Sequence, residues 1–207
     1  MDYFSVNDLL EIRMTEKEKM LAGHIYDPAD SVLSKERQHA RQLCRQFNQS
    51  TETEKKLRIK ILKDLFQTSN TTIWIEPSFK CDYGYNIKFG DKVFINFDCI
   101  ILDTAQVSLG NNVMLGPGVH IYTPEHPIDA TQRISWKEKS SPVLIADDVW
   151  IGGGAIICPG VTIGQGTVIG AGSVVTKDIP AGVVAVGNPC RVLRKIGPED
   201  KITLSQF

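Results

Sequence analysis

The sequence has no long hydrophobic run and no marked excess of charge of either sign. Its longest apolar runs, such as AIIC at 155–158, are far shorter than the ~20 residues that cross a bilayer as a helix. The 23 Lys and Arg residues balance 24 Asp and Glu, so no broad field would attract nucleic acid or a membrane surface. Any site for an anion must therefore be built locally.

The sequence also lacks a paired cysteine motif. Its five cysteines are scattered and include no Cys-x-x-Cys, which argues against a disulfide framework or a zinc knuckle. The opening MDYFSVNDLL has no basic region followed by an apolar core, so it does not resemble a secretory signal. We therefore expect buried thiols in a reducing compartment, and a cytoplasmic protein.

The chain divides into two regions with different patterns. The first region, up to about residue 70, has a helical pattern. TEKE at 15–18 has the spacing of a capping box, and TETE at 51–54 repeats that signal. A second helix could begin at Asp30 or Ser31. Two apolar stripes with helical spacing predict packing surfaces: Ala40, Leu43, Cys44 and Phe47, then Leu57, Ile61, Leu62, Leu65 and Phe66.

From about residue 73 the helical period gives way to a six-residue repeat. Residues 143–178 divide into VLIADD, VWIGGG, AIICPG, VTIGQG, TVIGAG and SVVTKD, with glycine recurring in the fourth and sixth columns. Upstream, VSLGNN, VMLGPG and VHIYTP at 107–124 follow the same rule. The third column holds Ile145, Ile151, Ile157, Ile163, Ile169 and Val175, and Phe89, Ile95 and Ile101 continue it with a two-residue slip before Leu109.

A six-residue repeat is typical of a parallel β-helix. Short strands point every second side chain inward, and glycine adopts corner conformations that a Cβ would obstruct. The segments between repeats are too short for crossover helices, which excludes ordinary βαβ units. A sandwich with glycine-rich turns would not keep this register. Because a solenoid leaves open ends, the helical region and the C-terminal tail are expected to act as caps.

The repeat is interrupted by an 18-residue polar excursion at 124–141. Ile121 and Ile145 flank it at a distance of 24 positions, which is four repeats, so the register resumes in phase. Of the four histidines, His120 lies in the strand before the excursion, facing outward, and His126 lies within it. A long loop on a rigid scaffold is a common place for catalytic residues. His126 is therefore the stronger catalytic candidate, and His120 is expected to be a wall or interface residue.

Several motifs are similar to those of the hexapeptide-repeat acyltransferases: IGGG, PGVTIGQGTVIGAGSVVTKDIPAG and VGNPCRVLRK. MTEKEKMLAG, DYGYNI, NFD and HIYTPEHPID narrow the resemblance to the maltose O-acetyltransferases, with galactoside O-acetyltransferases as near relatives. The match runs from about residue 14 to 196. It implies a mainly β chain with a helical region at 1–70, a left-handed parallel β-helix at 71–196 and a tail at 197–207.

The resemblance implies transfer of acetyl from acetyl-CoA to a sugar hydroxyl. It places the catalytic histidine in the HP dipeptide, so His126 would act as general base, since neutral imidazole accepts protons at cellular pH. Asn96 would lie close to the reacting centre, stabilising the tetrahedral intermediate or holding the acceptor. Asp27, Asp82 and Asp103 would bind acceptor hydroxyls, although aspartates in corners and turns are the alternative interpretation.

The resemblance also implies a coenzyme A site near the C-terminus. Coenzyme A carries a pyrophosphate and a 3′-phosphate, which need fixed donors and cations. TKD at 176–178 and RVLRK at 191–195 concentrate positive charge, although such charges could simply solubilise the last coil. The implied contacts are Thr176, Lys177, Arg191 and Arg194, with Gly153 and Ala171 along the pantetheine path.

Three positions bear on the details of this site. Galactoside enzymes carry an acidic pair where this chain has Asp103-Thr104, which favours glucose or maltose as acceptor. Gly153 stands where a serine can occur, so one hydrogen bond to the cofactor is expected to be absent. Glu138 in the excursion could orient the imidazole, but a solvated loop charge is the simpler interpretation.

The resemblance further implies a homotrimer with active sites between neighbouring β-helices, burying outward residues such as Met114, Trp150 and Val168. Three other functions stay open. The acceptor could be another hydroxyl, on a galactoside, an oligosaccharide or an antibiotic. A metal-dependent β-helix hydratase would need three histidine ligands, whereas His24 and His39 lie in the helical region, so we expect no metal. A non-catalytic binding protein is the third.

Overall fold

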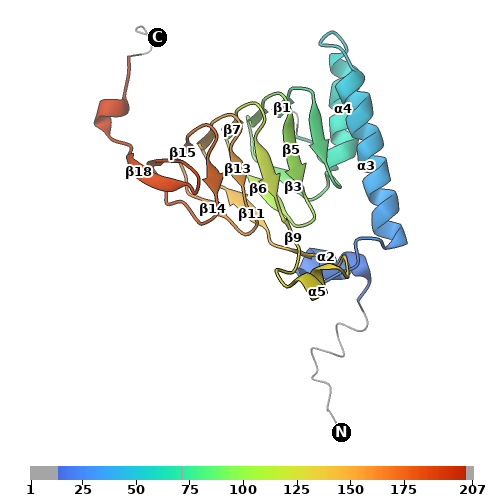
Figure 1. Cartoon of the computed structure of the whole chain (residues 1–207). Helices are drawn as coiled ribbons and strands as arrows, with labels where there is room; N and C mark the ends of the chain where they lie inside the picture. Colours follow the sequence, from blue (N-terminus) through green and yellow to red (C-terminus); the bar gives the residue numbers. More distant parts are fainter. Residues whose placement is uncertain (1–13, 71, 204–207) are drawn as a thin grey trace.

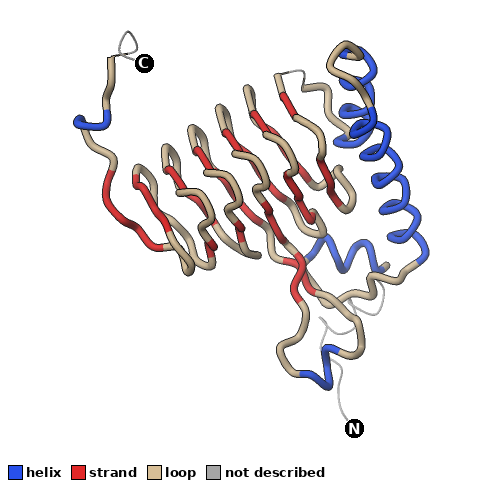
Figure 2. The backbone as a smooth tube through the Cα atoms, turned by 45° about the horizontal axis from the view of Figure 1, so that its top comes forward, coloured by secondary structure: helices blue, strands red, loops and turns tan. Residues whose placement is uncertain are grey.

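Three mainly parallel sheets form the three faces of a β-helix, and each of the first four coils contributes one strand to each face (Figures 1 and 2). The computed structural model describes residues 14–70 and 72–203. Ile145 pairs with Ile163, 18 positions on, so a full coil in the C-terminal half consists of three hexapeptides. The predicted mainly β fold of stacked short strands is therefore confirmed.

Each face is named here after its first strand. The β1 face contains β1 (Trp74–Ile75), β4 (Phe94–Ile95), β7 (Met114–Leu115), β12 (Trp150–Ile151), β15 (Val168–Ile169), β17 (Val183–Val186) and the antiparallel β18 (Arg191–Lys195). The β2 face contains β2 (Phe79–Cys81), β5 (Cys99–Leu102), β8 (His120–Tyr122), β13 (Ile156–Ile157) and β16 (Val174–Val175). The β3 face contains β3 (Ile87–Phe89), β6 (Val107–Leu109), β11 (Val143–Ile145) and β14 (Thr162–Ile163).

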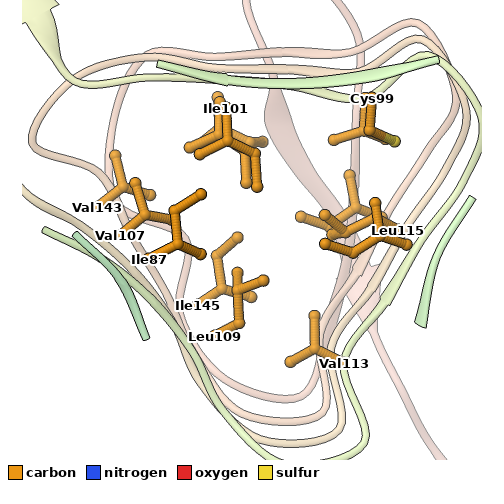
Figure 3. Close-up of a cluster of buried hydrophobic side chains, with 14 of the residues drawn as sticks. Ile87, Cys99, Ile101, Val107, Leu109, Val113, Leu115, Val143 and Ile145 are labelled. Carbon is orange, nitrogen blue, oxygen red and sulfur yellow. The ribbon is translucent and has the colours of Figure 1, made fainter. Parts of the chain in front are cut away.

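The core lies inside the solenoid, where inward side chains of successive coils stack on one another (Figure 3). The third column of the repeat, Ile145 to Val175, is fully buried, as the periodicity predicts. The first column is buried too, and where it holds Thr167 and Ser173 the hydroxyls bond to the carbonyl oxygens of Pro180 and Gly170. These two hydroxyl groups thus have hydrogen-bond partners inside the core.

Glycine in the fourth column allows the coils to stack closely. A Cβ on Gly164 would lie 2.4 Å from the backbone nitrogen of Ala181, and one on Gly152 would lie 2.5 Å from that of Ala171. The neighbouring backbone cannot move away without breaking hydrogen bonds between the coils. These positions therefore require glycine because the backbones approach closely, and not because of an unusual φ.

From residue 14 onward, where the described structure begins, three helices precede the solenoid: α2 (Glu16–Ala22), α3 (Ser31–Gln49) and α4 (Lys55–Phe66). The predicted capping box of α2 is present, with Thr15 and Glu18 bonded reciprocally, and Asp30 caps α3. The TETE prediction is wrong: α4 begins only after Glu54, whose carboxylate accepts from the amide and hydroxyl of Thr51 in a preceding turn.

The helices α3 and α4 close the N-terminal end of the solenoid (Figure 1). Phe66 packs edge-on against Phe79 and Phe89, with ring centroids 5.8 Å and 4.8 Å away. Leu57, predicted to pack, is instead 44% exposed, because the buried face of α4 consists of Ile61, Leu65 and Phe66.

At the opposite end the chain finishes with β18 and a short 3-10 turn, η1 (Pro198–Asp200). Within residues 14–70 and 72–203, no helix is long and apolar enough to cross a membrane. The sequence predictions for the first ten residues and for the last four residues of the tail concern positions outside the described residues.

Candidate active site

The corner between the β2 and β3 faces is where the repeat is broken. Ile75 pairs with Ile95 and Phe89 with Leu109, both 20 positions apart, which is two more than in the later coils. The extra residues lie in this corner, at 82–86 and 103–106, and include the slip seen before Leu109 in the sequence. The excursion at 124–141 leaves the third coil at the same corner. Inserted polar residues from three successive coils therefore gather at one edge.

The excursion folds back on itself as a hairpin rather than an open loop. Strands β9 (Pro124–Glu125) and β10 (Lys139–Ser140) pair antiparallel, with α5 (Ala130–Arg133) between them. The N-terminal segment joins its edge: the amide of Tyr26 donates to the Glu138 carbonyl at 2.9 Å, and the return bond is 3.1 Å. The hairpin and α2 consequently lie side by side below the solenoid in Figure 1.

A pocket of about 500 Å³ opens between this hairpin, α3 and the corner. That volume suits a small polar ligand such as a mono- or disaccharide. The pocket is lined by Pro28, Arg37, Arg41, Asp82, Leu102, Thr104, Tyr122, Pro124, His126, Glu138 and Pro159.

His126 lies in this pocket with its side chain 43% exposed. Its Nδ1 is 3.3 Å from the carbonyl oxygen of Lys137, which only a protonated Nδ1 can bond. In the neutral ring that tautomer leaves the lone pair on Nε2. The backbone of the excursion therefore holds the ring in the form in which Nε2 can accept a proton.

Glu138 links His126 to the N-terminal segment. Its Oε1 is 3.7 Å from His126 Nε2, too long for a hydrogen bond but close enough for a charge interaction. Its Oε2 accepts a 2.5 Å hydrogen bond from the hydroxyl of Tyr26, which is only 1% exposed. With its side chain 19% exposed, Glu138 is not the solvated loop charge that the sequence favoured. Burial and the Glu138 carboxylate raise the pKa of Tyr26, which stays a donor.

Asp82 and two arginines form the opposite wall. Burial raises the pKa of the Asp82 carboxyl, while the charges of Arg41 and Arg37 oppose that shift. The Arg37 guanidinium is fixed by hydrogen bonds to the Tyr83 hydroxyl at 2.7 Å and to the Pro28 carbonyl. This wall therefore offers both acceptors and donors for hydroxyl groups.

Asp103, predicted to bind the acceptor, is fully buried and lies behind the pocket wall. Its Oδ1 accepts from the amides of Asp82 and Tyr83 at 3.0 Å and 2.9 Å, which ties the first two coils together at the corner. Its Oδ2 is buried and has no hydrogen-bond partner among the described residues. Burial raises the pKa of Asp103 to about 7. Its placement is thus that of a corner aspartate.

Asp27 and Asn96 lie outside the pocket of a single chain. Asp27 is exposed next to Pro28 at the pocket rim, and its Oδ1 accepts from the Ala29 amide at 2.8 Å. Asn96 follows β4 at the corner between the β1 and β2 faces, where its Oδ1 accepts from the Phe97 amide at 2.8 Å. Of the catalytic and acceptor-binding residues predicted from sequence, one chain brings only His126 and Asp82 together in the pocket.

The residues predicted to bind coenzyme A are divided between edges of the solenoid. Gly153 and Ala171 lie at the β1–β2 corner, the same edge as Asn96, whereas Thr176 and Lys177 follow β16 at the β2–β3 corner. Arg191 and Arg194 are exposed on β18. The Arg194 guanidinium is held by the Asp200 carboxylate at 2.6 and 2.7 Å, a pairing that the sequence did not indicate.

The sequence missed Tyr26, whose hydroxyl bonds to Glu138, and Arg37, Arg41 and Tyr122, which line the pocket. Their signals are weak, because the first three belong to helical or turn segments with no repeat. Tyr122 lines the pocket, and its hydroxyl is 2.6 Å from Nδ1 of His120, which is half-buried on the outer surface of the β2 face. No cluster of three or more His, Cys, Asp or Glu side chains suited to a metal ion occurs within residues 14–70 and 72–203.

Comparisons with known proteins match both regions of the chain. The maltose acetyltransferase hexapeptide capping motif matches residues 19–69, and the bacterial transferase hexapeptide of six repeats matches residues 142–177. A candidate acetyltransferase of Dictyostelium discoideum is 46% identical over 187 residues, covering 90% of this chain and 97% of that protein.

Two solved structures are similar over most of the chain. A maltose O-acetyltransferase from Clostridium difficile 630 is 56% identical with a TM-score of 0.87, covering 89% of this chain and 98% of that one. A galactoside acetyltransferase in complex with coenzyme A is 38% identical with a TM-score of 0.88, covering 93% and 96% respectively.

Proposed function

The chain belongs to the hexapeptide-repeat acetyltransferase family, and we propose that it transfers acetyl from acetyl-CoA to a hydroxyl of a glucose- or maltose-type sugar. The observation that carries the proposal is His126, held by a backbone carbonyl in a pocket whose other polar walls are Asp82, Glu138 and two arginines. An imidazole with a free Nε2 beside hydroxyl-binding groups suits deprotonation of an alcohol.

The proposed reaction uses His126 as general base. Nε2 takes the proton of the acceptor hydroxyl as its oxygen attacks the thioester carbonyl. Collapse of the tetrahedral intermediate breaks the carbon–sulfur bond, and the imidazolium returns the proton to the departing thiolate, so the products are the acetyl ester and coenzyme A. Glu138 stabilises the transient imidazolium by its charge. Alignment of the two substrates supplies much of the remaining rate enhancement.

The choice of acceptor rests on the acidic and basic wall. Asp82 would accept hydrogen bonds from sugar hydroxyls, and Arg37 and Arg41 would donate to them. Glucose or maltose is favoured by the similarity to the maltose enzyme and by Asp103-Thr104, where galactoside enzymes carry an acidic pair. Asp103 would contribute indirectly, by holding the backbone of Asp82. A galactoside or another hydroxyl acceptor is the alternative, supported by the similarity to a galactoside enzyme.

The donor site is proposed to form between subunits of a homotrimer. Thr176, Lys177 and Arg191 offer exposed donors suited to phosphates, while Asn96, Gly153 and Ala171 line a different edge. A neighbouring chain would bring the two edges together. Outward apolar side chains that stack along the β1 face support such an interface: Trp74, Phe94, Met114, Trp150 and Val168. Sedimentation of the 23.0 kDa chain measures the number of subunits in the assembly.

The test of the proposed function is release of coenzyme A from acetyl-CoA in the presence of different acceptors. Maltose, glucose, a β-galactoside and isopropyl thiogalactoside are compared at equal concentrations. We expect the highest kcat/KM with glucose or maltose. A preference for galactosides would replace the acceptor and keep the reaction. No release with any sugar, in a protein that binds acetyl-CoA, would reject sugars as the acceptor class.

The Glu138→Gln variant is expected to lower kcat by about 2- to 5-fold, because a half-exposed ion pair is worth up to about 1 kcal/mol. The KM for the acceptor should change little, because the substitution removes the counter-charge of an imidazolium that forms only during the transfer. Tyr26→Phe, which removes only the hydroxyl that fixes Glu138, should show a weaker change in the same direction. An unaltered kcat in both variants would mean that Glu138 only braces the hairpin.

A further inference from the structure

Two of the five cysteines face each other at the N-terminal end of the solenoid. The sulfurs of Cys44 and Cys81 are 3.8 Å apart, and both thiols are free. Cys44 lies on the buried side of α3, and Cys81 is the last residue of β2. Nothing in the proposed acetyl transfer uses them. Because they are 37 positions apart, no sequence motif pairs them.

The pair borders a cationic pocket on the surface. This pocket, of about 440 Å³, adjoins the acceptor pocket, and Cys44 and Cys81 line it together with three cations, Arg41, Arg45 and Lys80, and one acid, Asp82. Each cysteine is 5% exposed, so both residues belong to the edge of the buried core and border this pocket. Positive charge around a thiol favours its thiolate, which is the form that reacts with oxidants.

The two sulfurs are also unequal. The hydrogen bond from Cys81 lowers the pKa of the Cys44 thiol, and the charge of Arg45 acts in the same direction. The same hydrogen bond, together with burial, raises the pKa of Cys81. Burial and the Asp103 carboxylate act against ionisation of Cys44, but its pKa is lowered on balance, so Cys44 ionises more readily than Cys81. Cys44 therefore suits the role of attacking thiolate and Cys81 that of resolving thiol.

We propose that Cys44 and Cys81 form a reversible oxidation site that a hydroperoxide converts into a disulfide between α3 and the first coil. The Cys44 thiolate attacks the peroxide oxygen, giving a sulfenic acid and releasing hydroxide or alkoxide. The Cys81 thiol then attacks that sulfur, forming the disulfide and releasing water. The peroxide is reduced by two electrons and the two thiols are oxidised by two.

The disulfide would act on the acceptor pocket through a shared wall. Arg41, Asp82 and Leu102 line both pockets, and Asp82 directly follows Cys81. Bond formation brings the sulfurs from 3.8 Å to about 2.05 Å, which draws α3 toward β2 beside Asp82. Oxidation should therefore change the KM for the acceptor, a consequence that rests on the proposed function, whereas the disulfide itself does not.

The experiment treats the full-length protein with hydrogen peroxide and maps peptides without reduction. We expect a cross-linked pair of peptides containing Cys44 and Cys81, about 2 Da lighter than their sum, two fewer titratable thiols, and reversal by dithiothreitol. The melting temperature should rise by at least about 3 °C, since the cross-link closes a long loop. The acceptor KM should change at least about 2-fold.

Three variants make the result decisive. Cys44→Ser and Cys81→Ser should each lose the cross-link and the shift in melting temperature, and Cys158→Ser, a half-buried thiol on another coil, should keep both. The proposal would be overturned if peroxide oxidised Cys158 while Cys44 and Cys81 still reacted with an alkylating reagent. The mapping of the wild-type protein decides this even if a variant folds poorly. A cross-link without any change in acceptor KM would overturn the coupling and keep the oxidation site.

Discussion

The His126→Ala variant is expected to lower kcat for acetyl transfer by about 10²- to 10⁴-fold, the range that general-base help contributes. The pocket and the orientation of Asp82 do not depend on the imidazole, whose contacts are with Lys137 and Glu138 of the same hairpin. The KM values for both substrates should therefore change much less than kcat. Steady-state kinetics with the best acceptor of the panel, at saturating acetyl-CoA, measure the loss.

His120→Ala is the matched control because it removes the neighbouring imidazole from the same region. His120 is half-buried on the outer surface of the β2 face, where its ring contacts the Tyr122 hydroxyl. We expect the kcat of this variant to stay within about 3-fold of the wild-type value, because it loses only the contact with Tyr122, which lines the pocket wall. If the His120 variant lost activity and the His126 variant kept it, the general-base assignment would pass to His120.

Asp103→Asn is expected to flatten the dependence of stability on pH. The carboxyl has a pKa of about 7 in the folded protein, against about 3.9 in an unfolded chain. Between these values the folded state keeps a proton that the unfolded state has lost, so the free energy of unfolding falls as pH rises from about 4 to 7. The loss amounts to as much as about 4 kcal/mol, at about 1.4 kcal/mol per pH unit.

Asparagine removes the titration while its Oδ1 can still accept from the amides of Asp82 and Tyr83. Urea unfolding at one protein concentration, at pH 5 and pH 8, should show a smaller difference in the variant than in the wild type. A residual slope of the same sign should persist, because burial raises the pKa of Asp82 as well. Asp98→Asn, at an exposed corner, is the control and should keep the full slope. An identical slope in Asp103→Asn and the wild type would contradict a buried, protonated Asp103.

The repeat predicted the solenoid correctly because its physical cause is local. Inward positions recur every second residue, and glycine is needed wherever one backbone passes close to the next. Both requirements act within a single hexapeptide, so each repeat shows them. The register therefore followed from the third column alone, including the two-residue slip before Leu109. The TETE prediction failed because the same residue spacing also suits a turn before a helix, and the choice depends on where the helix packs.

The candidate site could be predicted only in part. His126 stood out because it lies in a polar insertion within a strict repeat, a signal visible without any structure. Glu138 was assigned to solvent, since its partner Tyr26 is 112 positions away and no period connects a turn to a hairpin. For Asp103 the sequence allows both an acceptor-binding residue and a corner aspartate, because spacing along the chain does not show that its carboxylate lies in the interior. The roles of Asn96 and of the coenzyme A residues stay predictions.

The sequence by itself determined the β-helix, its register and the corner from which the excursion departs, because stacking of short strands obeys spacing along the chain. Only the tertiary structure decided which polar groups share one pocket. Arg37, Asp82 and Glu138 come from α3, the first coil and the excursion, and they meet because α3 and the hairpin pack against one edge of the solenoid. Such contacts depend on how elements dock, which no local pattern records.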